Sequence, residues 1–500
     1  MSLELRSITK RFPGILANDA VDLSIDPGEI VAVLGENGAG KTTLMNVAYG
    51  LYGADEGSIL VDGEPLAPAS TTAAIAAGIG MVHQHFMLVP VFTVAENIIL
   101  GDEPTGAAGW IERKQASDRV RTISEKYNLA VDPDATVEDL PVGVQQRVEI
   151  IKVINRKARY LIFDEPTAVL TPQEVEEFFH IVRGLREDGK GVVFISHKLD
   201  EALEIADRIV VMRQGRKVAE VLPGETSEEG LAELMVGRPV ELVVHKGTAT
   251  PGTTVLEVRD LVVVDDRSHR ACDGVSFTVR AGEIVGIAGV NGNGQSELVD
   301  AITGMRLPMA GSVLVNGEDV TAAPPREMHK ASVAHVPEDR QESGLVLAFS
   351  VAENLVLDSY YDPPYSKGLF MDWSKVNETA AQLVKQYDVR TAGISVPVGT
   401  LSGGNQQKVI IAREFNRPAI LVLAAQPTRG VDVGSIEYIH SQIVAKRDKG
   451  AAVLVVSTEL DEVLALADRI LVMYEGRIAG EFSPTDDITD IGLAMLGGGQ

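Results

Sequence analysis

The sequence predicts an α/β fold with two tandem domains, each built on a mainly parallel sheet. A chain of 500 residues is too long for a single hydrophobic core. Blocks of sequence from the first half return in the same order in the second half. In each half, short β-branched runs alternate with helical patterns. This alternation is typical of a parallel sheet with helices on both faces.

The internal repeat is long and keeps its order. "PGEIVAVLGENGAGKTTL" near Gly28 returns as "AGEIVGIAGVNGNGQSEL" near Gly282, with an offset of 254 (289 minus 35). "LIFDEPTAVL" returns as "LVLAAQPTRG" with an offset of 261 (425 minus 164). The extra residues of the second half therefore lie just before Val351 and between Ala352 and Leu401. Such a repeat indicates the duplication of a whole domain.

The domain boundary is predicted from composition. The stretch "HKGTATPGTT" at 245–254 is polar and turn-rich, as linkers often are. We therefore predict one domain over residues 1–245 and a second domain over residues 246–500.

Local patterns predict the elements that position a site. The apolar run Ile30–Leu34 is expected to be a strand, and Lys41–Tyr49 a helix. Tyr160–Phe163 and Gly191–Ile195 are further candidates for buried strands, each followed by a polar residue. Functional loops of such sheets follow the carboxyl ends of the strands, so we expect the site at that edge.

Composition narrows the possible functions. The apolar fraction of 45% and the charged fraction of 23% are those of a globular protein. The formal net charge of −26 disfavours a nucleic-acid partner. Cys272 is the sole cysteine and is expected to be a small, partly buried residue, which suits a reducing cytoplasm. No signal peptide or apolar run long enough to span a bilayer is found, so we expect a soluble chain that reaches any membrane through a partner.

A glycine-rich loop in the first half predicts a phosphate site. Residues 35–42, "GENGAGKT", match G-x-x-x-x-G-K-[ST] between a strand and a helix. Glycines let backbone N–H groups surround phosphate oxygens, and the helix N-terminus adds positive potential. Lys41 would reach the β- and γ-phosphates of ATP, and the Thr42 hydroxyl would ligate Mg²⁺. The expected nucleotide contacts are Gly35, Asn37, Gly38, Gly40, Lys41, Thr42 and Thr43.

Four further residues of the first half complete a predicted catalytic set. Asp164 ends an apolar strand and would hold Mg²⁺, while Glu165 beside it would act as general base toward water. An Asp-Glu pair on its own is more often a solvated turn, but a nearby phosphate loop favours function. His197 would bond the γ-phosphate and orient the water. Gln84 is a candidate contact for Mg²⁺ or water; the histidines on either side of it are expected in packing or surface roles.

Together these motifs resemble the ATPase subunit of ABC transporters across essentially the full chain. The diagnostic element is "LSGGNQQK" at Leu401–Lys408, which matches the signature motif of that family. The resemblance implies a phosphate-loop domain with an antiparallel β subdomain and a helical subdomain in each half. It also implies that Ser402, Gly403 and Gly404 contact nucleotide held by the other module. Phe12 would stack on adenine, with a core position as the alternative.

The second half lacks the same chemistry at matching positions. Gln295 replaces Lys41, and Ala425 and Gln426 replace the acidic pair. The signature motif of the first half is also altered, with Pro141 and Val142 in place of serine and glycine. The remaining replacements are Thr458 for His197, Glu338 for Gln84, and Asp265 or Asp266 for Phe12.

The second pocket is therefore predicted to be non-hydrolytic. Loss of a general base alone typically costs about 10²- to 10⁴-fold in rate. Its loop keeps Gly289, Gly292, Gly294 and Ser296, which could still offer N–H groups to phosphate. Whether this pocket is empty or exchanges nucleotide slowly stays open from the sequence.

Fused modules of this kind are similar to importers of simple sugars and nucleosides. The stretch "MVHQHFMLVPVFTVAENIILG" looks like the nucleoside type, so we expect ATP-driven nucleoside import. Import of a monosaccharide of the ribose or galactose type is the alternative. A soluble translation factor is disfavoured because such factors usually keep both pockets and carry a long charged segment. A non-hydrolysing nucleotide sensor is a further rival.

The resemblance also implies partners and a location. Two integral-membrane permease subunits would dock near Gln84 and Glu338, and an extracytoplasmic solute-binding protein would act with them. The chain would then lie at the cytoplasmic face of the cell membrane. The apolar stretch "HFMLVPVFTV" is a candidate docking surface or, equally, a buried segment.

Overall fold

The chain forms two compact units, Met1–Val240 and Glu241–Gln500. The computed structural model describes residues 2–13, 15–66, 70–83, 86–104, 110, 112–127, 129–167, 170, 172–240, 244–368 and 370–498. The boundary predicted from the sequence lies after residue 245, in the stretch without regular structure that leads into the first strand of the second unit.

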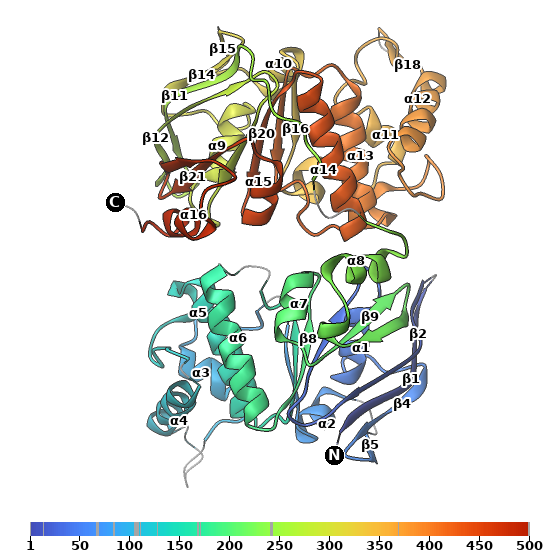
Figure 1. Cartoon of the computed structure of the whole chain (residues 1–500), viewed down its shortest axis with the longest axis vertical. Helices are drawn as coiled ribbons and strands as arrows, with labels where there is room; N and C mark the ends of the chain where they lie inside the picture. Colours follow the sequence, from blue (N-terminus) through green and yellow to red (C-terminus); the bar gives the residue numbers. More distant parts are fainter. Residues whose placement is uncertain are drawn as a thin grey trace. The chain divides into compact units, whose positions relative to one another are not determined.

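The first unit contains two sheets (Figure 1). An antiparallel sheet has the strand order β2-β1-β4-β5: β1 (Leu3–Phe12), β2 (Ile15–Ile25), β4 (Glu56–Val61) and β5 (Glu64–Pro65). A six-stranded sheet has the order β10-β9-β3-β8-β7-β6: β3 (Ile30–Leu34), β6 (Ile79–Val82), β7 (Tyr160–Asp164), β8 (Gly191–Ile195), β9 (Arg208–Arg213) and β10 (Arg216–Val221). Only the pair β9 and β10 in this second sheet is antiparallel. The predicted mainly parallel sheet is thus confirmed.

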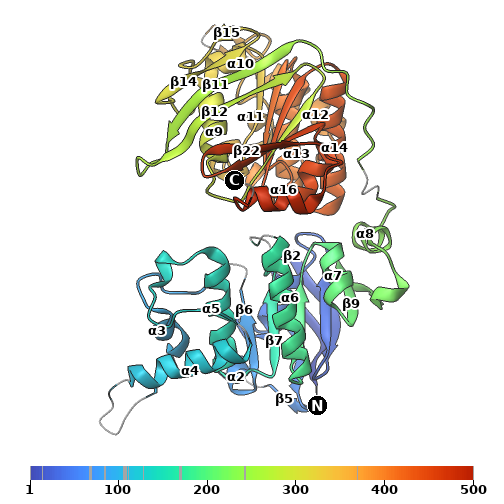
Figure 2. The same ribbon diagram turned by 60° about the vertical axis from the view of Figure 1, so that its left-hand side comes forward.

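Helices cover these sheets and form a separate lobe. Figure 2 shows α3, α4 and α5 gathered at the end of the unit that lies away from the antiparallel sheet, and we name these three helices the helical lobe. The helices of the unit are α1 (Lys41–Ala48), α2 (Thr71–Ala76), α3 (Val94–Ile99), α4 (Arg113–Lys126), α5 (Val142–Asn155), α6 (Pro172–Glu187), α7 (Leu199–Ile205) and α8 (Glu228–Val236), with short 3-10 turns at Val137–Asp139 and Pro223–Glu225.

The core explains why the apolar runs become strands. Every residue of β3, β7 and β8 is buried, as expected for central strands that are covered on both faces. One core cluster joins β1, β3 and α1 through Leu5, Val31 and Leu44. The phosphate loop is therefore set between two packed sheets. The predicted strand Tyr160–Phe163 continues to Asp164, and the predicted helix from Lys41 ends at Ala48 rather than Tyr49.

The second unit repeats this topology. Its sheets have the orders β12-β11-β14-β15 and β16-β19-β20-β13-β21-β22. The strands are β11 (Thr254–Val264), β12 (Arg270–Arg280), β13 (Ile284–Ala288), β14 (Ala310–Val315), β15 (Glu318–Asp319), β16 (Val333–Val336), β19 (Leu421–Ala425), β20 (Ala452–Ser457), β21 (Arg469–Tyr474) and β22 (Arg477–Phe482). The helices are α9 (Gln295–Ile302), α10 (Pro325–Lys330), α11 (Val351–Leu355), α12 (Trp373–Gln386), α13 (Gly403–Asn416), α14 (Val433–Asp448), α15 (Leu460–Leu466) and α16 (Ile488–Met495), with a 3-10 turn at Val398–Thr400.

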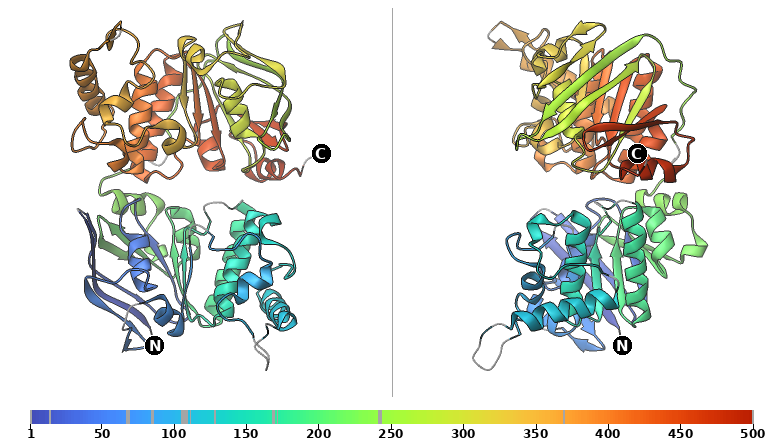
Figure 3. Two further views of the ribbon diagram at one scale, coloured as in Figure 1. Left: turned by 180° about the vertical axis from the view of Figure 1, so that it is seen from behind. Right: turned by 90° about the vertical axis from the view of Figure 1, so that its left-hand side faces the viewer.

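Two insertions distinguish the second unit. The pair β17 (Ser366–Lys367) and β18 (Phe370–Met371) forms a small hairpin beside α12 (Figure 1 and Figure 3). A π-helical turn at Arg340–Gly344 lies between β16 and α11. Both lie where the changing offset of the repeat predicts extra residues. Within the described parts of both units, no helix combines the length and the apolar content that a bilayer crossing requires.

The two units differ where the helical lobe meets the six-stranded sheet. In the first unit a cavity of about 510 Å³ lies there, lined by Ile75, Met81, Gly101 and Val153 among others. The repeat places a polar residue at each of these four positions in the second unit: His329, His335, Asp358 and Glu414.

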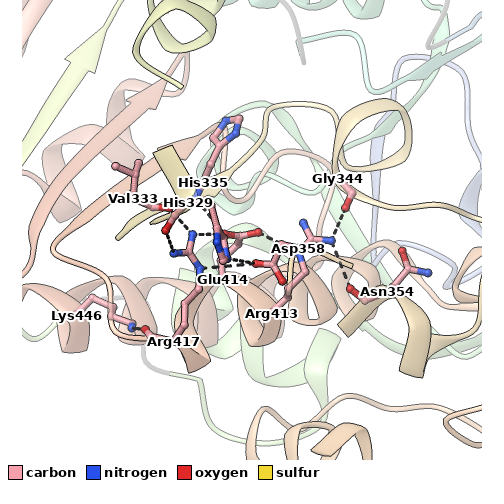
Figure 4. Close-up of polar contacts among 10 residues, drawn as sticks. All are labelled: His329, Val333, His335, Gly344, Asn354, Asp358, Arg413, Glu414, Arg417 and Lys446. Carbon is pink, nitrogen blue, oxygen red and sulfur yellow. Dashed lines mark hydrogen bonds and ion pairs between the residues drawn. The ribbon is translucent and has the colours of Figure 1, made fainter. Parts of the chain in front are cut away.

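These four residues join a buried polar network in the second unit (Figure 4). His329 Nε2 lies 3.2 Å from Asp358 Oδ2, and the backbone N–H of His335 donates to Glu414 Oε2 at 3.2 Å. Arg413 donates to Glu414 Oε1 at 3.0 Å and to the carbonyl oxygen of Gly344 at 2.9 Å. Arg417, the C-cap residue of α13, donates to the carbonyl oxygen of His329 at 3.3 Å. The network therefore ties α13 to α10, to β16 and to the π-helical turn.

The imidazole of His335 makes the stability of the second unit depend on pH. Burial lowers the pKa of His335 to about 4; the charge of Glu414 opposes this shift and that of Arg413 adds to it. Because the folded pKa lies below the unfolded value, the unfolded chain takes up the proton first as pH falls. Stability from the neutral imidazole is complete above about pH 6.5 and is lost toward pH 4.

We expect His335→Met, which restores the residue of the first unit, to reduce the dependence of unfolding free energy on pH by at most about 1.4 kcal/mol per pH unit between pH 6.5 and 4. Urea unfolding followed by Trp373 fluorescence in a Trp110→Phe background measures this in the second unit. His269→Met removes an exposed histidine and serves as the control. If the unfolding free energy of His335→Met depended on pH as strongly as that of the wild-type chain, this would contradict a buried, neutral imidazole at His335.

Candidate nucleotide-binding site

The glycine loop between β3 and α1 has a backbone that its neighbours enforce. Gly38 and Gly40 have φ angles of 83° and 97°, in the left-handed region that favours glycine. A Cβ atom on Gly40 would lie 2.2 Å from the carbonyl oxygen of Ala17. The buried Asn18 side chain donates to the Gly40 carbonyl oxygen at 3.0 Å. Packing therefore fixes the curve of the loop at the N-terminus of α1.

Lys41 is a buried cation on this loop. Only 5% of its surface is exposed, and its Nζ donates to the carbonyl oxygens of Gly35 at 2.7 Å and Glu36 at 3.2 Å. Burial lowers the pKa of Lys41, against the opposing charges of Glu165, Asp164 and Glu36. An ammonium that donates to neutral carbonyls on its own loop is available to exchange one of them for a phosphate oxygen.

The acidic pair lies at the carboxyl end of β7, beside the start of α1. The Thr42 hydroxyl donates to Asp164 Oδ1 at 3.3 Å. Glu165 has a φ of 49°, an uncommon conformation for a residue other than glycine, and its N–H donates to the carbonyl oxygen of Ile195 at 3.0 Å. His197, which follows β8, has Nδ1 at 3.5 Å from Glu165 Oε1.

The two neighbouring carboxyl groups have pKa values shifted in opposite directions. Burial raises the pKa of Asp164 to about 6, an effect that the Thr42 hydrogen bond opposes and the charge of Glu165 increases. Burial alone would raise the pKa of Glu165, but the hydrogen bond and charge of His197, with the charge of Lys41, bring it below its usual value. Glu165 is therefore ionised and able to accept a proton at neutral pH.

The structure thus brings five predicted residues together at one edge of the sheet: Lys41, Thr42, Asp164, Glu165 and His197. Asn37 and Gly38 are exposed on the loop, and Thr43 is half-buried on the first turn of α1. Gln84 and His85 lie outside the described residues. Ser402, Gly403 and Gly404 belong to the second unit.

Phe12 is the last residue of β1 and is partly exposed. Its ring packs edge-on against Tyr52, with centroids 5.5 Å apart, and Lys10 Nζ lies 5.5 Å from the ring centre. The core position offered as an alternative is therefore wrong for Phe12. Tyr52 did not emerge from the sequence, because nothing local in "LYGAD" links it to a residue forty positions earlier.

A buried carboxyl group behind the acidic pair was also missed. Glu201 on α7 accepts hydrogen bonds from Thr167 Oγ1 at 2.6 Å and Ser196 Oγ at 3.2 Å, so it holds the turns that follow β7 and β8. In the second unit Glu462 likewise accepts from Thr428 Oγ1 at 2.6 Å. The repeated "LDE" of both halves was the available signal.

The predicted signature residues form the start of α13. Ser402 is the N-cap residue, and its Oγ accepts from Asn405 Nδ2 at 2.8 Å. A Cβ on Gly404 would lie 2.3 Å from Ser435 Oγ, so α13 begins in close contact with the start of α14. In the first unit Pro141 occupies the matching N-cap of α5. Proline provides neither the hydroxyl nor the N–H of Ser402 there.

The second loop keeps the backbone of the first without its chemistry. Gly292 and Gly294 have φ angles of 90° and 97°, close to those of their counterparts. Gln295 takes the place of Lys41, is buried, and donates to the carbonyl oxygen of Val290 at 3.1 Å. Gln426 keeps a left-handed φ of 46°, and its N–H donates to the carbonyl oxygen of Val456 at 2.7 Å.

Strand register identifies the counterpart of Phe12. Leu3 pairs with Val61, and Leu256 pairs with Val315, which gives an offset of 253 (256 minus 3) along β1 and β11. Ser7 and Asp260, which both have a positive φ angle, show the same offset of 253 (260 minus 7). The sequence left Asp265 and Asp266 open, and this register selects Asp265.

A glycine loop at a helix N-terminus, beside a pair of carboxylates at the end of a parallel strand, defines a phosphate-loop nucleotide-binding unit. Here the fold occurs twice in one chain. The family model described as ABC transporter matches residues 18–168 and 272–429. The chain therefore belongs to the ABC transporter family, whose ATP-binding proteins are ATPases.

Curated relatives match nearly the whole chain. It is 50% identical to the nucleoside import ATP-binding protein NupA of Lactococcus lactis subsp. cremoris, over 99% of this chain and 98% of that protein. It is 48% identical to the guanosine import ATP-binding protein NupO of Bacillus subtilis, over 100% and 98%. Identity to the ribose import ATP-binding protein RbsA 1 of Rubrobacter xylanophilus is 43%, over 99% and 98%.

A solved structure supports the paired fold. The RNase-L inhibitor aligns with a TM-score of 0.64 over 98% of this chain and 93% of that chain, at 21% identity. At this identity the likeness concerns the fold alone.

Proposed function

We propose that the chain is the ATP-hydrolysing subunit of a nucleoside importer. The observation that carries this proposal is the 50% and 48% identity, over nearly the full length, to proteins named for nucleoside and guanosine import. A ribose importer is the alternative, favoured by the 43% identity to a ribose import protein. Because the identities to the nucleoside and guanosine import proteins are higher, they favour a nucleoside importer over a ribose importer.

Catalysis is assigned to the first unit. Lys41 binds the terminal phosphates, and Glu165 takes a proton from water while His197 orients that water and the γ-phosphate. The lowered pKa of Glu165 supports its role as the base. Gln84 is assigned a contact to the metal or the water, as its place after β6 suggests.

The Thr42 and Asp164 oxygens, 3.3 Å apart beside the loop, are suitable donors for Mg²⁺. When bound there, the ion would neutralise phosphate charge.

The remaining nucleotide contacts follow the family resemblance. Phe12 is assigned to adenine, and its partly exposed ring beside Tyr52 supports this role. Ser402, Gly403 and Gly404 are assigned to phosphate recognition, through the Ser402 hydroxyl and the N–H groups at the start of α13. The second pocket is assigned no hydrolysis, because Gln426 cannot accept a proton and Gln295 carries no charge.

Two permease subunits are the proposed membrane partners, with an extracytoplasmic solute-binding protein acting beyond them. Met87, Val91 and Phe92 are exposed in the stretch after Gln84, which favours a docking surface over a buried segment. The second unit exposes Val346, Leu347 and Phe349 in the matching stretch. Docking through these surfaces would hold the chain at the cytoplasmic face of the membrane.

We expect Glu165→Gln to lower steady-state ATP hydrolysis by the assembled importer at least about 10²-fold, because the general base is lost. Phosphate release from the purified complex measures this rate. Gln426→Ala, at the matching position of the second unit, is the control and is expected to leave the rate within about twofold. Substantial ATP hydrolysis by Glu165→Gln would contradict the proposal that only the site of the first unit hydrolyses ATP.

The solute is tested by uptake in cells that lack the gene for this chain. Radiolabelled guanosine uptake is expected to be restored by the wild-type chain and not by Glu165→Gln. Ribose uptake is expected to be the same with and without the chain. Restored ribose uptake with unchanged guanosine uptake would favour the alternative importer.

A further inference from the structure

Glu338 places a carboxylate at the second glycine loop. It follows β16, and the repeat aligns it with Gln84 of the first unit. Its Oε2 accepts a hydrogen bond from Ser296 Oγ at 2.7 Å, and its Oε1 pairs with Arg429 Nη1 at 2.7 Å. Ser296 is the counterpart of Thr42. The Ser296 hydroxyl is thus bonded at 2.7 Å to a carboxylate that the first unit lacks, whereas the Thr42 hydroxyl lies 3.3 Å from Asp164.

This carboxylate lines a small pocket. The cavity beside the second loop has a volume of about 100 Å³, and Glu338 lines it together with Gly292, Gln295, Ser296 and Gln426. Ligand pockets typically measure about 300–1,000 Å³. A triphosphate that entered along the loop would have to break the Ser296 bond and come close to the carboxylate.

The second loop also differs from the first in the charged side chains around it. The second loop lacks the lysine of the first, since Gln295 replaces Lys41. On the following helix, Glu297 and Asp300 occupy the positions of Thr43 and Asn46.

These carboxylates are close enough to affect one another. The pKa of Asp300 is raised by burial; Arg306 opposes the shift, and the charges of Glu297, Glu338 and Asp266 increase it. The repeat thus places Glu338, Glu297 and Asp300 around the second loop, where the first unit has the neutral Gln84, Thr43 and Asn46. The lysine and the acidic pair of the first unit are replaced by Gln295, Ala425 and Gln426.

We propose that Glu338 excludes polyphosphate nucleotides from the second pocket, as an internal anion that occupies the Ser296 hydroxyl and repels the phosphates. The inference rests on the proposed function, because it assumes that the first loop binds ATP. It identifies the residue that decides how many nucleotides one chain holds.

The test uses the full chain and the probe 8-azido-ATP. After photolysis and limited proteolysis, label is assigned to peptides of Met1–Val240 or of Glu241–Gln500. Label in the first unit is the internal reference for folding and binding. In the wild-type chain the ratio of second-unit to first-unit label is expected to be low. In Glu338→Gln, which keeps the shape and removes the charge, the ratio is expected to rise about tenfold or more.

Two further variants test whether an increased label ratio reflects the loss of the Glu338 charge or a general loosening of the second unit. Glu342→Gln makes the same charge change on an exposed residue of the same segment and is expected to leave the ratio unchanged. Arg429→Gln frees Glu338 from its cation but leaves the carboxylate, so no increase is expected.

Three outcomes would overturn the proposal: no increase in Glu338→Gln, an equal increase in Glu342→Gln, or a wild-type ratio near one. Absence of label from the first unit would instead count against the proposed function.

Discussion

The position of Lys41 is the constraint on which the rest of the site depends. A buried ammonium is held by two carbonyl oxygens of its own loop, and that loop is fixed by contacts with Ala17 and Asn18. The parallel sheet then sets the end of β8 next to β3 and the end of β7 next to β8, which brings Asp164, Glu165 and His197 to the same edge. Opposite pKa shifts in the two adjacent carboxyl groups follow from this crowding, since only one of them faces His197.

The second unit shows which features of the loop belong to folding and which to chemistry. A Cβ on Gly294 would lie 1.9 Å from the carbonyl oxygen of Ala271, and one on Gly289 would lie 2.6 Å from that of Met473. These glycines are required by packing whether or not nucleotide binds. Their retention is therefore weaker support for binding than the sequence suggested. The side chains have diverged, and so has the junction with the helical lobe, which contains a cavity in the first unit and a buried polar network in the second.

Much of this arrangement was predictable because its signals are local. Continuous apolar runs such as Ile30–Leu34 predict central strands, and the loop motif and acidic pair follow directly after such runs. The network around Glu414 was not predictable, since its members are single residues far apart in the sequence. Each becomes informative only when the fold brings it to the others. Tyr52 was not predictable for the same reason, whereas Glu201 had a signal in the repeated "LDE". Phe12 was assigned to adenine only through the family resemblance.

The central claim is that one chain provides one working nucleotide site, built around Lys41 and Glu165. It is tested most directly by counting the nucleotide retained by the assembled Glu165→Gln importer after incubation with radiolabelled ATP and removal of loosely bound ligand. The account predicts one unhydrolysed ATP for each copy of this chain. Two retained nucleotides per chain, or recovery of the label as ADP, would contradict it.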